Sequence, residues 1–208
     1  MKKYLLLILS FLLTFSLCSC SSVSYKDDIE KTVDGYLSIY KNGDNLDKVQ
    51  AYCTDNYVDD LSVIDDELLN DENLGDVFNK EAKDFVRVCG MNFIKDYTVH
   101  NIEVSNQEAI VDVTIQGIKF SEFSLDSYED EIMDAKETYI NENMDEYETI
   151  YKTDGEQAAY QKLYDDSSKA VFDKMKDIVS SLHKDTYDVS AIVICQDGAW
   201  KIDELIVE

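Results

Sequence analysis

The sequence contains no proline, only seven glycines and a single arginine, Arg87. Proline and glycine are the residues that most often interrupt helices and build turns or flexible linkers. Their scarcity favours long helices, and no change in composition marks a boundary between two domains. We therefore expect one domain over residues 25–208.

Basic residues are also few, with 19 Lys and Arg against 44 Asp and Glu and a formal net charge of −25. Proteins bind nucleic acid mainly by neutralising its phosphates with Lys and Arg, so we expect no nucleic-acid partner. The same imbalance disfavours attachment to anionic lipid headgroups through surface charge. Clusters of carboxylates will lie on any solvated face of such a chain, so none of them alone indicates a site.

The motifs of common catalytic and cofactor sites are missing as well. There is no glycine-rich phosphate loop, and His100 and His183 have no partners at ligand spacing. Cys53, Cys89 and Cys195 match no metal or redox spacing, so we expect small buried apolar residues, with a disulfide as the open alternative. We predict no cofactor and no metal site, and we favour a binding protein over an enzyme.

The first 20 residues show the pattern of a bacterial export signal. Two lysines precede an apolar run over residues 4–17, which is short for a membrane span. The sequence Leu-Cys-Ser-Cys at residues 17–20 resembles a lipobox, the site at which bacterial lipoproteins are cleaved and lipidated. This resemblance implies cleavage between Ser19 and Cys20 and attachment of diacylglycerol to Cys20. Residues 1–19 would then be a lipoprotein signal peptide, and an ordinary secretory signal with two incidental cysteines is the alternative.

A lipid on Cys20 would tether the protein to the outer face of the cell membrane, in an extracytoplasmic position. Loss of Lys2 and Lys3 with the signal would lower the formal net charge from −25 to −27. Residues 20–24 then form only a short spacer, so we expect the domain to lie close to the bilayer.

Apolar periodicity divides the remaining chain into helices and strands. Steps of three and four residues predict helices over 29–40, 46–52, 58–68 and 77–93. Alternation predicts strands over 97–105 and 109–120, joined by a turn at Asn106-Gln107. A second hairpin is expected over 187–206, with its turn at Asp197-Gly198. One face of its first strand is expected to carry Tyr187, Val189, Ala191, Val193 and Cys195. Trp200, Ile202, Glu204 and Ile206 follow on the return strand.

Residues 125–184 are the most helical part of the chain. Two apolar stripes predict two antiparallel helices of about 27 residues each, with one continuous helix as the alternative. Residues 153–156, Thr-Asp-Gly-Glu, fit a capping box at the start of the second helix. We interpret the aromatic residues of the stripes as core. The stripes consist of Ile132, Met133, Ile140, Met144, Tyr147 and Tyr151, and of Tyr160, Tyr164, Val171, Met175, Ile178 and Leu182.

The order of these elements, with residues 29–52, 108–114 and 197–203, resembles a group of uncharacterised lipoproteins of Gram-positive bacteria. Their cone-shaped α+β domain is similar to nuclear transport factor 2 and ketosteroid isomerase. The resemblance implies an α+β fold in which N-terminal helices pack on a four-stranded antiparallel sheet. The long helical hairpin would be inserted between the two strand pairs.

We expect a non-catalytic binding or interaction module at the cell envelope, with an envelope protein or a small ligand as its partner. The alternative is a small-molecule-binding protein or an enzyme that uses a pocket in the cone. In isomerases of the cone fold, an acid on the sheet works beside a buried tyrosine. Asp112 and either Tyr36 or Tyr40 would be the corresponding residues here, although a strand acid such as Asp112 can simply face water.

Overall fold

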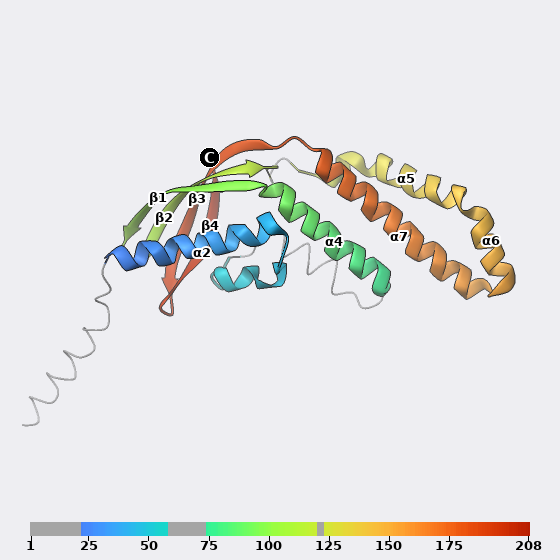
Figure 1. Cartoon of the computed structure of the whole chain (residues 1–208), viewed down its shortest axis with the longest axis horizontal. Helices are drawn as coiled ribbons and strands as arrows, with labels where there is room; N and C mark the ends of the chain where they lie inside the picture. Colours follow the sequence, from blue (N-terminus) through green and yellow to red (C-terminus); the bar gives the residue numbers. More distant parts are fainter. Residues whose placement is uncertain (1–21, 58–73, 120–122) are drawn as a thin grey trace, which may run out of the picture.

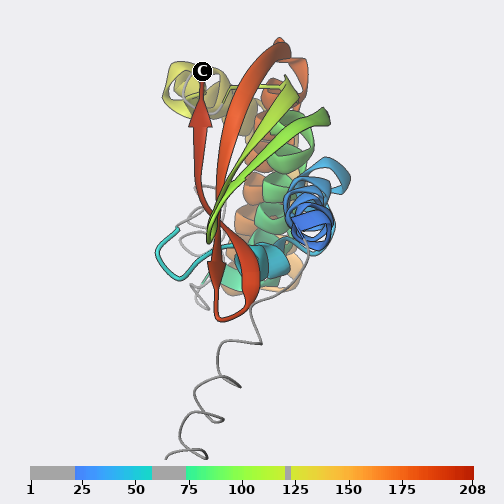
Figure 2. The same ribbon diagram turned by 90° about the vertical axis from the view of Figure 1, so that its left-hand side faces the viewer.

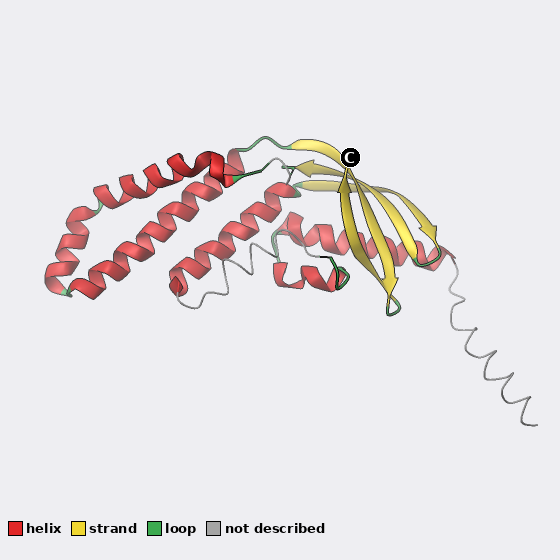
Figure 3. Cartoon of the chain, turned by 180° about the vertical axis from the view of Figure 1, so that it is seen from behind, coloured by secondary structure: helices red, strands yellow, loops and turns green. Residues whose placement is uncertain are grey.

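The computed structural model describes residues 22–57, 74–119 and 123–208. The expected export signal, Ser19 and Cys20 lie outside these residues, as does the helix expected over 58–68. The described chain has an α+β fold, with a four-stranded antiparallel sheet and a group of helices that extends beyond one end of it (Figures 1 and 3). Within the described residues, no helix is both long and apolar enough to span a bilayer.

The strands lie in sequence order across the sheet, and each is antiparallel to the next. Both expected hairpin turns are confirmed, with positive φ angles of 58° at Asn106, 52° at Asp197 and 84° at Gly198. Alternate residues of the two central strands are buried, as the period of two predicted. The strands are β1 (Asp96–Ser105), β2 (Glu108–Gly117), β3 (Asp185–Gln196) and β4 (Ala199–Val207).

A bulge in β4 changes which side chains face the core. The pairing with β3 passes from Ile202 directly to Glu204, so Asp203 is an extra residue. After this bulge the alternation is reversed, and Leu205 packs against the core while Glu204 and Ile206 are exposed. The regular alternation from Trp200 to Ile206 is therefore interrupted after Ile202, because Asp203 is inserted there.

One face of the sheet is covered by α2 (Ser22–Asn42), which contacts both edge strands (Figure 2). The helix begins at Ser22, earlier than its expected start at Ile29 and within the residues expected as a spacer. Next come η1 (Leu46–Tyr52) and α4 (Gly75–Phe93). We call the sheet, α2, η1 and α4 the body. Its core is apolar and includes Ile29, Val33, Leu37, Val49, Phe85, Val111, Val113, Val193 and Ile202.

We call residues 125–181 the arm; they lie between β2 and β3 in the sequence. The first of the two expected long helices is divided at Asn143, and the chain then turns back at Gly155 into α7, which packs along both halves. The elements are η4 (Leu125–Tyr128), α5 (Glu129–Glu142), α6 (Met144–Thr153) and α7 (Glu156–Ser181).

The capping box predicted at residues 153–156 is not formed. Thr153 still belongs to α6, where its hydroxyl donates a hydrogen bond to the carbonyl oxygen of Thr149 at 3.1 Å. The residue before α7 is Gly155, which has a positive φ of 95° and no side-chain cap. The glycine therefore allows the reversal that we had assigned to a capping threonine.

The arm is attached to the body along α4, which lies between α2 and α7 in Figure 1. The ring of Phe172 on α7 packs at centroid distances of 5.1 Å from Phe78 and 6.1 Å from Phe85, both on α4. Beside these rings, the Lys176 ammonium lies 2.9 Å from a carboxylate oxygen of Glu81. A small aromatic cluster and a buried ion pair thus fix the arm in place.

Candidate functional site

The structure does not bring the predicted pocket residues together. Asp112 lies on β2 opposite Ser190 and is exposed, whereas its neighbours Val111 and Val113 point into the core. Tyr36 and Tyr40 are buried on α2, on the core side of the sheet. Asp112 therefore lies on the face of the sheet opposite the two tyrosines, in the position of a strand acid that faces water.

The space expected to hold a ligand in the cone is filled with side chains. Tyr36 and Tyr40 pack edge to face at a centroid distance of 5.3 Å, and the Tyr36 hydroxyl lies 3.3 Å from that of Tyr57. Trp200 closes the same core and packs edge to face against Tyr25. No observation on the described residues therefore favours a small-molecule site between α2 and the sheet.

The opposite face of the sheet carries a row of hydrogen bonds that sequence reasoning missed. The Thr114 hydroxyl donates to an Asp188 carboxylate oxygen at 2.6 Å and lies 2.8 Å from Nε2 of His100. Because the hydroxyl has one proton, Nε2 of His100 is the donor in this arrangement. His100 and Asp188 are exposed and Thr114 is half-buried on this open strand surface. Their evident effect is to link β1, β2 and β3.

Among the described residues, Cys89 and Cys195 are free thiols, and the Cys53 thiol lies 3.5 Å from the backbone carbonyl oxygen of Val49. Cys53 and Cys89 are buried, as expected for small apolar residues, whereas Cys195 is only half-buried. Burial raises the pKa of the Cys89 thiol to about 12, so this thiol stays protonated and unreactive. Among the described residues, no group of three or more His, Cys, Asp or Glu side chains is placed to hold a metal ion.

A groove lies between α6 and α7, at the end of the arm. It has a volume of about 370 Å³ and lies on the side of the arm farthest from the start of α2 (Figure 1). We call it the aromatic groove. The residues that line it are Met144, Tyr147, Glu148, Tyr151, Lys152, Glu156, Ala159, Tyr160 and Leu163.

Two tyrosines of this groove are strongly exposed, Tyr151 at 56% and Tyr160 at 63%. Nearby, Met144 and Tyr164 are also exposed. The interpretation of Tyr151, Tyr160 and Tyr164 as core residues was wrong. Among the described residues, only α6 and α7 line the groove, so each helix has one neighbour there instead of two, and part of its apolar stripe stays in contact with solvent.

The floor of the groove is rigidly built around Tyr147, which is buried. Its hydroxyl donates to a carboxylate oxygen of Asp166 at 3.2 Å, and the Lys162 ammonium lies 2.7 Å from the same carboxylate. Burial and the nearby Asp166 charge raise the pKa of Tyr147 to about 12. Tyr147 is therefore a neutral hydrogen-bond donor that fixes α6 on α7, while Tyr151 and Tyr160 remain accessible.

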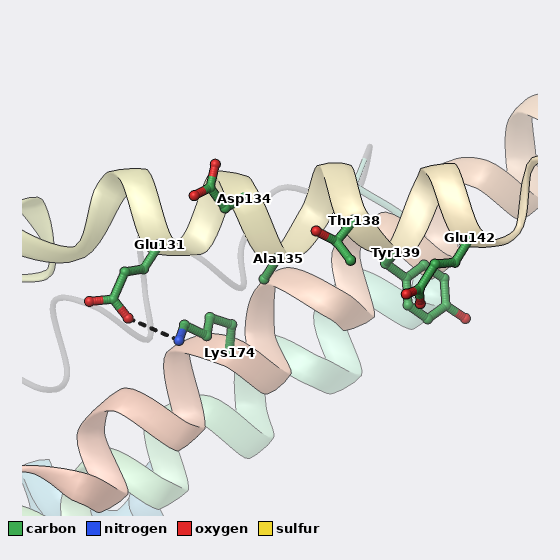
Figure 4. Close-up of a pocket in the computed structure, with 7 residues that line it drawn as sticks. All are labelled: Glu131, Asp134, Ala135, Thr138, Tyr139, Glu142 and Lys174. Carbon is green, nitrogen blue, oxygen red and sulfur yellow. Dashed lines mark ion pairs between the residues drawn. The ribbon is translucent and has the colours of Figure 1, made fainter.

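A second hollow, of about 510 Å³, lies on the arm between α5 and α7. Glu131 points toward Lys174 at 2.9 Å, and Asp134 points away from α7 (Figure 4). Glu142 closes the hollow at the end of α5. Only one of these three carboxylates has a cation beside it within the hollow, so the surface is negative. We call it the acidic hollow.

The ion pair at the base of the arm is the least predictable charged feature. Glu81 is 5% exposed, and its carboxylate lies 2.9 Å from Lys176 and 3.3 Å from Lys80. The hydrogen bond from Lys176 lowers the pKa of Glu81 despite the opposing effect of burial. The spacing of apolar residues on α4 does not show that Glu81 is buried. From the sequence alone, Glu81 could therefore not be distinguished from the many acids that face solvent.

Comparison with known proteins adds little to this description. No protein-family model and no curated protein matches the sequence. One solved structure is similar, that of a "putative lipoprotein (ycdA)" from Bacillus subtilis, with 16% identity and a TM-score of 0.44. The match covers 85% of this chain and 52% of the other, so this chain spans about half the length of that protein. A likeness this weak determines neither the fold nor the function.

Proposed function

We propose that the protein is an extracytoplasmic lipoprotein, tethered to the outer face of the membrane through diacylglycerol on Cys20, and that it acts as a non-catalytic binding module. The tether rests on the sequence of residues 1–20. The likeness to the nuclear transport factor 2 fold is a proposal on the same footing, from residues 29–52, 108–114 and 197–203. The binding role rests on one observation: two tyrosines of the aromatic groove are more than half exposed.

The arrangement of the molecule supports this assignment. The start of α2 and the end of the arm lie at opposite ends of the long axis (Figures 1 and 3). Only Ser21 separates Cys20 from α2, so a lipid on Cys20 would leave almost no spacer. The arm, whose α7 is 26 residues or about 39 Å long, would then extend away from the anchor. A binding surface at its end would be presented to partners rather than to the membrane.

The tether is tested by the substitution Cys20→Ala. We expect this variant to lose incorporation of labelled palmitate and either to be released from the cell or to remain as the uncleaved precursor. Cys18→Ala is the matched control and should still be labelled. If the wild-type protein took up no label, the lipoprotein assignment would be wrong.

The binding role is tested by placing a photo-crosslinking amino acid at Tyr160 in the full-length protein in intact cells. We expect a discrete crosslinked product at this position. The same amino acid at Glu103, on the exposed face of β1, should give none. Equal labelling at both positions, or labelling of lipid alone, would contradict the binding role of the groove.

A further inference from the structure

We propose that the aromatic groove and the acidic hollow together bind a cationic amphipathic helix of another protein. This inference names the partner class for the binding role proposed above and rests on that role. The apolar side of the partner would enter the groove, and its Lys or Arg side chains would lie near the carboxylates of the arm.

The groove provides the apolar half of such an interface. Tyr151 and Tyr160 present exposed rings, and Met144 adds a flexible apolar side chain. Tyrosine is enriched among the residues that dominate binding energy, because its large ring loses little conformational entropy on binding. Methionine adapts to partner side chains of different shape. These residues fit an apolar helix face, which binds in grooves of this kind.

The charge of the arm provides the complementary half. Residues 125–181 carry sixteen Asp and Glu against six Lys, a formal net charge of −10. Several of the lysines are already paired, including Lys152 with Glu148 at 3.1 Å and Lys174 with Glu131 at 2.9 Å. The surplus carboxylates therefore have few cations on their own helices, and a cationic partner would be attracted and oriented by them.

The two surfaces are spaced for one helix. Leu163 of the groove and Lys174 of the hollow are eleven positions apart on α7, which places them on the same side of that helix, about 16 Å apart. A partner helix of about four turns that lies along α7 would reach both surfaces. Its apolar and cationic residues would then be separated along its length as well as around it.

Charge also decides against other occupants. A second copy of this chain would bring another formal charge of −25 to the same surface. Residues 58–73 of the chain itself contain seven Asp and Glu and no Lys or Arg. An anionic lipid surface would be repelled in the same way. A partner with positive charge is the occupant that the acidic arm favours.

The probe is a synthetic fluorescent peptide of about four helical turns, with leucines on one side and lysines on the other. Two matched peptides replace every lysine by glutamate or every leucine by serine. We expect fluorescence anisotropy to show binding of the first peptide only, with an affinity that falls as salt rises. A β-1,4-linked N-acetylglucosamine oligomer and anionic lipid vesicles serve as the alternative ligands.

Variants of the full domain locate the binding. The double variant Tyr151→Ser with Tyr160→Ser should bind the peptide about tenfold more weakly, or weaker still. Glu131→Gln, Asp134→Asn and Glu142→Gln together should weaken it about fivefold and reduce its dependence on salt. Glu103→Gln, Glu108→Gln and Glu204→Gln, all exposed on the sheet, remove as many charges elsewhere and should change little. Circular dichroism at helical wavelengths, which follows both the body and the arm, verifies folding. Tyr160→Ser alone replaces the double variant if that fails to fold.

The outcomes separate this inference from the function on which it rests. If no cationic peptide binds, or if binding is unaffected by the arm variants, the proposal of a cationic helix as the partner is wrong. It is also wrong if the sugar oligomer or the vesicles bind at the tyrosines instead. A protein crosslinked at Tyr160 in cells would in these cases leave the binding role intact. Failure of both the peptide and the crosslink would overturn both proposals.

Discussion

The body and the arm have similar apolar spacing but opposite surface properties. In the body, the stripes of α2 and α4 face a sheet or a second helix and are buried. In the arm, α6 packs mainly against α7, and Tyr151, Tyr160 and Tyr164 remain exposed. The difference shows that a period of three and four residues identifies which side of a helix is apolar. The number of neighbouring elements decides how much of that side is covered.

The largest expected effect comes from separating the two regions with Phe172→Ala. Phe172 is 3% exposed and contacts two aromatic rings of α4, so its loss should cost about 3–5 kcal/mol. Trp200 is the single tryptophan and lies in the body. Its fluorescence therefore follows the body, while circular dichroism at helical wavelengths follows both regions. We expect the helical signal to be lost at lower denaturant concentration than the Trp200 signal.

Coincident transitions in the Phe172→Ala variant would show that the body and the arm unfold as one unit. The two regions would then differ only in their surface properties. Tyr160→Ala is a suitable control, because it also removes an aromatic side chain from α7 but at an exposed position. In that control, Trp200 fluorescence and circular dichroism should change at the same denaturant concentrations as in the wild type.

A similar but smaller loss is expected within the body for Gly117→Ala. A Cβ atom at Gly117 would overlap the backbone carbonyl of Phe93, where α4 ends against β2. The backbone there is held by hydrogen bonds from Lys95 to Gln116 at 2.9 Å and from Ile118 to Asn92 at 3.0 Å. Because backbone cannot move aside as a side chain can, we expect a loss of about 3 kcal/mol in chemical denaturation. Gln116→Ala, at the exposed neighbouring position, should have little effect.

The ion pair between body and arm predicts a smaller, pH-dependent effect. Glu81→Gln should cost about 2 kcal/mol at neutral pH, because it removes the charge that Lys176 and Lys80 contact. The pKa of Glu81 is lowered from 4.5 in the folded protein, so its contribution is complete above that value. It is lost as the pH falls through the lower folded pKa. The difference in unfolding free energy between wild type and variant should therefore shrink in acid.

Asp84→Asn is the matched control for this prediction. Asp84 lies on the same helix, is half-buried with its side chain 43% exposed, and is 3.8 Å from Arg87, so its replacement should cost less than about 1 kcal/mol. A wild-type and Glu81→Gln difference that stayed constant down to strongly acid pH would contradict the assigned pKa direction. It would also show that the charge of Glu81 does not contribute to the attachment of the arm.

The sequence predicted the strands and turns better than the arm. Asn106 and the Asp197-Gly198 pair determine their turns locally, and alternation on β2 follows directly from one buried face. The bulge at Asp203 was not predictable, because its partner is Thr54, whose hydroxyl donates to the Asp203 carboxylate at 2.8 Å from a distant part of the chain. Features that depend on long-range contacts do not appear in local spacing.

The same limit explains what was missed at the candidate site. The exposure of Tyr151 and Tyr160 depends on where α4 and the other helices end in space. The local sequence of α6 and α7 does not encode those positions. The burial of Glu81 depends on Lys176 lying opposite it on α7. Asp112, in contrast, was correctly expected to face water, since its exposure could be inferred from the alternation of its own strand.

The smallest expected effect is also the most informative about the groove. Tyr147 and Tyr160 both line it, but Tyr147 is 6% exposed and Tyr160 is 63% exposed. Tyr160→Ser should change the free energy of unfolding by less than about 0.5 kcal/mol, as is usual for surface positions. Tyr147→Ser should cost about 3 kcal/mol, because it leaves a cavity and removes the hydrogen bond to Asp166. Denaturation of both variants measures this difference directly. An exposed tyrosine retained for packing would make the two losses similar. A negligible loss for Tyr160 means instead that its ring is available to a partner at little cost in stability, which the proposed binding role of the arm requires.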